Sequence, residues 1–254
     1  MARLSSQVIS IASTPGTVWC LENTGKIYVR TKVDPMNSPA GVEWLLLNLD
    51  QLDALGVRLK AISCGLDVVW AVDSVGGIWA RLSTEPVVQG GLTPAWVSLD
   101  LEEQDDRSSY SRKPKTDHIW TSSDGSIVWC LDEGGRAFCR LGITLDLPIG
   151  THWTEIEGNR CSSLAVASSA VWAVLPDGLL VKRQQVAPDN PSGDYWKGMP
   201  GYVHQMSASP TQTLWCLNTR GRLYRHTVNV YQSSLVDPGP QRLEDRLEHE
   251  WEVI

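Results

Sequence analysis

The chain has 254 residues, of which 20% are charged, and a formal net charge of −7. This negative balance argues against a nucleic-acid-binding surface, because such a surface normally presents basic side chains to the phosphates. No run of 18 apolar residues exists, so no transmembrane helix is predicted, and the N-terminal residues 1–7 lack the apolar stretch of a secretory signal.

Twelve tryptophans stand against a single phenylalanine, and many of them recur in order. Five short apolar segments align without gaps, each with a tryptophan at its second position. These repeated tryptophans are Trp19, Trp70, Trp129, Trp172 and Trp215. Because apolar residues are consecutive in these segments and do not alternate with polar ones, we expect strands that are buried on both faces.

A glycine follows each repeated tryptophan by six residues, and a second apolar pair comes soon after it. The repeated glycines are Gly25, Gly76, Gly135, Gly178 and Gly221. Glycine tolerates the positive φ that tight hairpins require, so the pattern predicts a strand, a turn and a second strand in a fixed register. Core packing is the expected role of the five tryptophans, since each buries about 150–250 Å².

Two further strands are predicted in each repeat. One precedes the tryptophan, and the other begins at a second tryptophan about 25 residues later: Trp44, Trp96, Trp153 and Trp196. Four strands in units of this length are typical of a propeller blade. The predicted fold is therefore all-β, a β-propeller over residues 1–236, with five blades favoured and six as the alternative if upstream sequence completes the ring.

The search for reactive groups finds no nucleophile elbow, phosphate-binding loop or metalloprotease motif. The five histidines occupy unrelated positions of the repeat, and no cysteine lies at zinc-ligand spacing. We therefore expect no enzyme activity, no metal and no cofactor. Cys20, Cys130 and Cys216 fill a position that is alanine in the other repeats, which favours reduced, packed thiols in the cytosol.

Several aromatic and basic residues have two interpretations, one structural and one functional. Trp79 and Trp120 lie outside both tryptophan positions and are candidates for a ligand face. Four repeats end in an arginine, and these side chains are expected to form salt bridges at strand ends or, alternatively, a cationic rim: Arg30, Arg81, Arg140 and Arg183.

Residues 237–254 form an acidic tail, with six acids and two arginines giving −4 of the net −7. The tail ends in an aromatic residue, two spacers and a branched aliphatic residue, preceded by acids. The candidate binding residues are Glu248, Glu250, Trp251, Glu252, Val253 and Ile254. Such a peptide suits β-augmentation, in which its backbone adds to a sheet edge and Trp251 and Ile254 act as anchors. The last four residues, Trp251–Ile254, also resemble the outer strand Trp153–Ile156, so they are predicted either as a ring-closing strand or as a free tail.

The repeated Val-Trp block, with its glycine, apolar pair, arginine and second tryptophan, resembles the tectonin repeat over nearly the whole chain. Ala137, Leu180 and His226 depart from the pattern. The resemblance implies a cytosolic role in autophagy and membrane traffic. It also implies that Trp251–Ile254 binds ubiquitin-like autophagy modifiers of the light-chain-3 and GABA-receptor-associated-protein families. The competing function is that of a lectin, because other tectonin proteins bind glycans or lipopolysaccharide.

Overall fold

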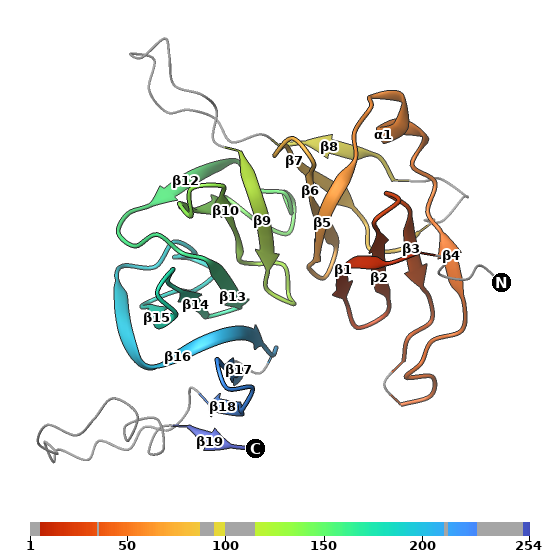
Figure 1. Cartoon of the computed structure of the whole chain (residues 1–254). Coiled ribbons are helices and arrows are strands. Elements are labelled where there is room, and N and C mark those ends of the chain that lie inside the picture. The colour runs from red at the N-terminus through yellow and green to blue at the C-terminus, as the bar shows by residue number, and fades with distance from the viewer. Residues whose placement is uncertain (1–5, 35, 87–93, 100–114, 211–212, 228–250) are drawn as a thin grey trace, which may run out of the picture.

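The computed structural model describes residues 6–34, 36–86, 94–99, 115–210, 213–227 and 251–254. The chain is an all-β propeller in which antiparallel sheets follow one another around an arc (Figure 1). Three sheets have four strands each and a further sheet has seven. We number the sheets as blades in chain order.

Blade 1 consists of β1 (Val8–Ser13), β2 (Val18–Glu22), β3 (Ile27–Arg30) and β4 (Trp44–Leu46). Blade 2 consists of β5 (Leu59–Cys64), β6 (Val68–Asp73), β7 (Ile78–Leu82) and β8 (Trp96–Ser98). Blade 3 consists of β9 (Thr116–Thr121), β10 (Val128–Asp132), β11 (Ala137–Leu141) and β12 (His152–Ile156). In each blade the strands pair in chain order, so the first strand is innermost and the fourth is outermost (Figure 1).

The seven-stranded sheet contains blade 4 and the strands that follow it. Its members are β13 (Ser163–Ala167), β14 (Ala170–Val174), β15 (Leu179–Arg183), β16 (Trp196–Ala208), β17 (Thr213–Asn218), β18 (Leu223–Thr227) and β19 (Glu252–Val253). The first part of β16 pairs with β15 as the outer strand of blade 4, and the second part pairs with β17. We call the second part of β16 with β17–β19 the last unit; it repeats the strand order of a blade.

The hairpins form where the repeated glycines predict them. Each of the five glycines adopts a positive φ, from 74° at Gly135 to 92° at Gly76. In blade 2, Asp73 completes the turn, since its carboxylate accepts hydrogen bonds from the backbone N–H groups of Val75 and Gly77 at 2.9 and 2.8 Å. Asp132 accepts the equivalent bonds in blade 3. These contacts satisfy turn donors that would otherwise lack partners.

The core lies between neighbouring blades. Trp19 packs in one cluster with Ile62 and Trp96 of blade 2. The next two interfaces place Trp70 against Trp153 and Trp129 against Trp196, with ring centroids 6.0 and 5.8 Å apart in edge-on geometry. Each first tryptophan is therefore covered by the outer-strand tryptophan of the following blade. Trp19, Trp70, Trp129 and Trp172 are all fully buried.

One short helix interrupts the otherwise all-β fold. α1 (Asp50–Ala54) lies in the link between β4 and β5. With five residues it is too short to produce the apolar periodicity by which a helix is recognised in a sequence. Asn48 precedes it and accepts a hydrogen bond from the backbone N–H of Asp50 at 2.9 Å. The side chain of Leu52, within this helix, is buried and anchors the helix to the interface of blades 1 and 2.

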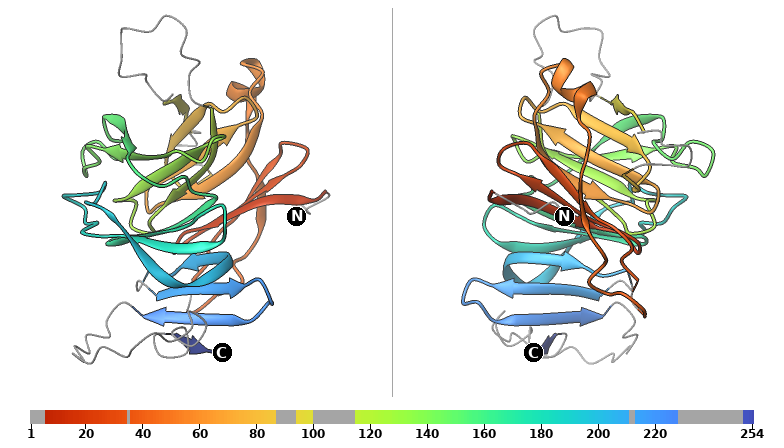
Figure 2. Two further views of the ribbon diagram at one scale, coloured as in Figure 1. Left: turned by 60° about the vertical axis from the view of Figure 1, so that its left-hand side comes forward. Right: turned by 90° about the vertical axis from the view of Figure 1, so that its right-hand side faces the viewer.

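The arc is open. The inner strands touch in sequence from β1 to β5, β9, β13 and β16. No comparable contact joins β16 to β1 among the described residues, and Figure 1 shows a gap there. In both turned views the last unit (blue) lies at one end of the molecule, with the C-terminal strand β19 as its outermost element (Figure 2). The C-terminal strand therefore does not join the last unit to blade 1.

We predict that Trp172→Ala lowers the free energy of unfolding by about 3–5 kcal/mol, because it removes a fully buried aromatic side chain. Trp215→Ala is the matched control, since Trp215 has the same place in the repeat but is only half-buried. We expect it to cost about 1–2 kcal/mol. Equilibrium denaturation measures both, and equal losses would contradict the account of the core.

Candidate interaction site

The C-terminal strand β19 is the outermost strand of the last unit. Its backbone pairs with β18, with Glu252 opposite Arg225 and Val253 opposite Tyr224. The backbone N–H of Ile254 donates to the carbonyl of Leu223 at 3.1 Å. β19 comes last in the strand order of its sheet, so one of its edges pairs with no other described strand.

Trp251, immediately before β19, is packed into the fold. Its side chain is 5% exposed and belongs to the same cluster as Trp172 and Leu180 of blade 4. The ring of His226 lies 4.9 Å from it, centroid to centroid. Trp251 therefore has the place in the last unit that Trp153 has in blade 3 and Trp196 in blade 4. The sequence left open a ring-closing strand and a free tail; in this structure the segment pairs with β18 as an outer strand but does not close the ring onto blade 1.

The indole N–H of Trp251 is buried and has no hydrogen-bond acceptor within the described residues. The equivalent Trp153 donates to the carbonyl of Leu99 at 3.2 Å. A buried donor without a partner forfeits its hydration, at a cost of about 1–3 kcal/mol. The same holds for the equivalent Trp196 of blade 4, whose indole N–H is also buried and has no acceptor among the described residues.

The other candidate residues of the tail are only partly described. Ile254 is 59% exposed and accessible to a partner. For Glu252 and Val253 the structure describes the backbone pairing. Glu248, Glu250 and the predicted boundary at residues 236 and 237 lie outside the described residues, so they stay predictions.

Arg81, Arg140 and Arg183 are buried, so these repeated arginines do not form the exposed cationic rim that was one of the two predictions. Arg140 donates to the backbone carbonyls of Ile149 and Gly150 at 2.7 and 3.2 Å. Arg183 does the same with Ser192 and Gly193 at 2.9 and 3.4 Å. Both guanidinium groups also lie over outer-strand tryptophans, at 5.4 and 5.5 Å from the ring centroids. Their function is to fasten the loop before the outer strand, as Arg30 does in blade 1.

The loops held by these arginines contain a second repeated glycine, which was not predicted from the sequence. Gly41, Gly150 and Gly193 each stand three residues before an outer tryptophan, and each has a positive φ of 64°, 64° and 58°. A Cβ atom at Gly193 would lie 2.6 Å from the carbonyl oxygen of Gln184. The signal that could have found these positions is the spacing Gly-x-x-Trp, which recurs in three blades.

The two tryptophans outside the repeated positions, Trp79 and Trp120, do not form an open ligand face. Trp79 is buried, and its indole N–H donates to the carboxylate of Asp73 at 2.9 Å. Trp120 is half-buried against the interface of blades 3 and 4 and stacks on His118, with ring centroids 5.6 Å apart. Both residues therefore serve packing more than recognition.

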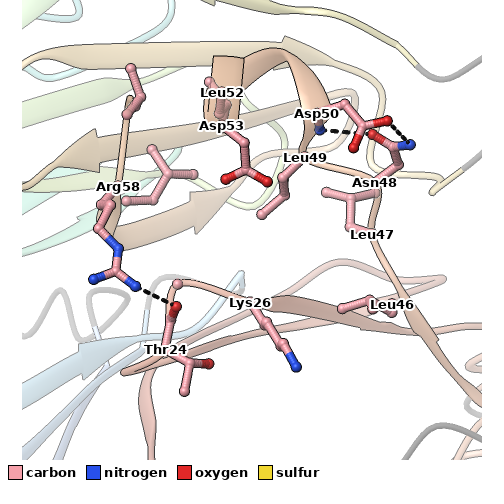
Figure 3. Close-up of a pocket in the computed structure, with 13 residues that line it drawn as sticks. Thr24, Lys26, Leu46, Leu47, Asn48, Leu49, Asp50, Leu52, Asp53 and Arg58 are labelled. Atoms are coloured by element: carbon pink, nitrogen blue, oxygen red, sulfur yellow. Dashed lines mark hydrogen bonds between the residues drawn. The ribbon is translucent and has the colours of Figure 1, made fainter. Parts of the chain in front are cut away.

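A hollow of about 560 Å³ lies between the β2–β3 hairpin and α1. Its floor is formed by Leu47, Leu52 and Leu59, which are buried. Figure 3 shows Leu49 and Asp53 pointing from the α1 side toward the hairpin residues Thr24 and Lys26. Arg58 spans one side by donating to the carbonyl of Thr24 at 2.8 Å. Because its rim carries both signs of charge, the hollow does not select an anion.

All six cysteines are free and buried. Burial raises the pKa of Cys161 to about 11 and that of Cys216 to about 12. These thiols stay protonated at neutral pH and are poor nucleophiles, because the thiolate is the reactive form. Within the described residues no group of three or more His, Cys, Asp or Glu side chains is placed to hold a metal ion. The described helix is also too short and too polar to span a membrane.

Comparison with known proteins identifies the class of this propeller. Residues 12–175 match the tectonin domain family, and residues 170–199 match a propeller family. The chain belongs to the tectonin family. It is 31% identical over 177 residues to human tectonin β-propeller repeat-containing protein 2, a match that covers 70% of this chain and 12% of that protein.

Solved structures agree with this fold. Human WBSCR16 matches with a TM-score of 0.60 at 14% identity, over 89% of this chain and 63% of the other. Prp20p from Saccharomyces cerevisiae matches with a TM-score of 0.58 at 12% identity, over 85% of this chain and 56% of the other. YCF48 from Cyanidioschyzon merolae matches with a TM-score of 0.55 at 14% identity, over 88% and 70%. At these identities the likeness concerns the fold alone.

We predict that Gly193→Ala destabilises the protein by about 1–3 kcal/mol, because alanine would be strained at this φ and would meet the carbonyl of Gln184. Gly198→Ala is the control, since no atom lies within 4 Å of a Cβ added there and its φ is not in the left-handed region. Thermal denaturation compares the two variants. A Gly193→Ala protein as stable as the Gly198→Ala protein would refute the role assigned to the loop.

Proposed function

We propose that this chain is a non-catalytic interaction scaffold with five blades, the last unit being the fifth, and that Trp251–Ile254 is its releasable ligand segment. The partners proposed for this segment are ubiquitin-like autophagy modifiers of the light-chain-3 and GABA-receptor-associated-protein families. Membership of the tectonin family supports the scaffold role, since propellers of this kind are typically not enzymes. A cytoplasmic site of action, in autophagy and membrane traffic, belongs to the same proposal.

The observation that carries the proposal is the weak attachment of β19. The outer strands β4 and β8 pair with their neighbours at three register positions and β12 at five, whereas β19 pairs with β18 at two. Each backbone pair contributes only about 0.5–1.5 kcal/mol, so a two-residue strand is released at a small cost. The edge of β19 that pairs with no other described strand also offers the backbone groups to which a partner strand can add.

Binding through Trp251 requires the side chain to leave its pocket. Contacts with Trp172 and His226 oppose this exit, while the indole N–H, which has no acceptor among the described residues, is hydrated outside. If the net cost of undocking is about 3 kcal/mol, the released state is populated about one time in a hundred or less. The fold then acts as an intramolecular competitor of the modifier.

The test compares a synthetic peptide of residues 244–254 with the intact chain. Short motifs of this size commonly bind with micromolar affinity, about −8 kcal/mol. We expect the peptide to bind a purified light-chain-3-type modifier at least about a hundredfold more tightly than the chain does. Isothermal titration calorimetry or fluorescence polarisation measures both affinities.

Trp251→Ala should remove binding in peptide and chain, since a tryptophan anchor commonly contributes at least about 2 kcal/mol. Trp44→Ala is the matched control, because Trp44 begins the outer strand of blade 1 as Trp251 precedes that of the last unit. We expect it to leave the affinity unchanged. Equal affinities of peptide and chain would contradict the competition, and binding that survives Trp251→Ala would refute the motif itself.

A further inference from the structure

The two ends of the arc expose surfaces that are buried at every other blade. We call Trp215, Leu217 and Leu223 of the last unit the leading face, and Val8, Ile11 and Trp44 of blade 1 the trailing face. At each interior interface, a leading face of one blade meets the trailing face of the next. The leading face of the last unit and the trailing face of blade 1 have no such neighbour among the described residues.

The difference in exposure between blade 1 and the interior blades is clearest at the inner strand of the trailing face. Ile11 corresponds by register to Ile62, Ile119 and Leu164, because the following residue in each strand lies opposite the repeated tryptophan. These three side chains are 5%, 4% and 1% exposed, and each packs in one cluster with the tryptophan of the preceding blade. Ile11 is 66% exposed. Val8 is 38% exposed, whereas its counterpart Leu59 is 5% exposed.

The leading face is open in the same way. Trp19, Leu21 and Ile27 of blade 1 are fully buried by blade 2. Their counterparts Trp215, Leu217 and Leu223 are only half-buried. Blades 2 and 4 also offer a hydrogen bond to the preceding tryptophan: Trp19 donates to the carbonyl of Thr84 at 2.9 Å, and Trp129 to that of Pro191 at 3.0 Å. Both carbonyls belong to the loop before the outer strand of the next blade.

We propose that a further tectonin-type blade, supplied by sequence outside these 254 residues, docks between the last unit and blade 1. Its inner strand presents a branched aliphatic residue, and its outer strand a tryptophan, to Trp215. Its own first tryptophan covers Ile11 and Trp44. This chemistry is the one with which the chain itself covers Trp19, Trp70 and Trp129.

Two observations favour such a blade over a second copy of the chain. The chain alone makes up more than half of each solved propeller that it resembles, so two copies exceed one such ring. In addition, solved propellers align with 85–89% of this chain while the chain covers 56–70% of them, which leaves part of those folds without a counterpart here.

The test uses two single-cysteine probes, Ile11→Cys at an exposed position and Leu217→Cys at a half-buried one, whose thiols react faster than the six buried native thiols. The rate of alkylation is measured in the chain of 254 residues and in a chain extended by a copy of residues 115–157 (blade 3) before Met1. We expect the added blade to slow alkylation at both probes by at least about tenfold, through burial. The matched control carries Ile119→Asp and Trp129→Ala in the added copy only, and its probes should react as in the unextended chain.

Three results would overturn the proposal. Unchanged alkylation in the extended chain would mean that the faces do not accept a blade. In a chain carrying both cysteines, an oxidative cross-link within one molecule would mean that the arc closes on itself. A cross-link between molecules, with a dimer in light scattering, would mean that a second copy is the occupant.

Discussion

The structure depends on the contact between a tryptophan of one blade and the inner aliphatic and outer tryptophan of the next. Trp70 and Trp129 are each covered in this way, in edge-on geometry that adds about 0.5–1.5 kcal/mol beyond the buried area. A blade is therefore not completed by its own four strands, because its largest side chain is buried only by its neighbour. Stability accumulates along the arc through interfaces between neighbours, as in other repeat folds.

This dependence explains why the last unit differs from the interior blades. Its tryptophan Trp215 has no following blade to cover it, and its outer strand β19 is the shortest in the protein among those described. The same unit nevertheless covers Trp172 through Trp251. Release of β19 would expose Trp172, so binding of a partner at the tail and the packing of blade 4 are energetically coupled.

Much of this fold can be read from the sequence, because the repeat encodes it locally. The positions of Trp19 and Gly25 and of their counterparts fix strands, hairpins and register, and Trp251 falls in the register of an outer strand. Other features depend on contacts between distant segments. The continuity of β16 through two sheets, the loops fastened by Arg140 and Arg183, and the hollow beside α1 follow from how the strands meet in space. The open arc results from how all the blades of the chain pack together, and the sequence of a single repeat does not predict it.

The central claim is that successive blades stabilise one another through their tryptophans, and a double-mutant cycle on Trp129 and Trp196 tests it most directly. Trp129→Leu, Trp196→Leu and the double variant are compared by equilibrium unfolding. The account predicts a coupling free energy of about 0.5–1.5 kcal/mol between the two rings, which lie 5.8 Å apart. Strictly additive losses would contradict it, because each tryptophan would then contribute to its own blade alone.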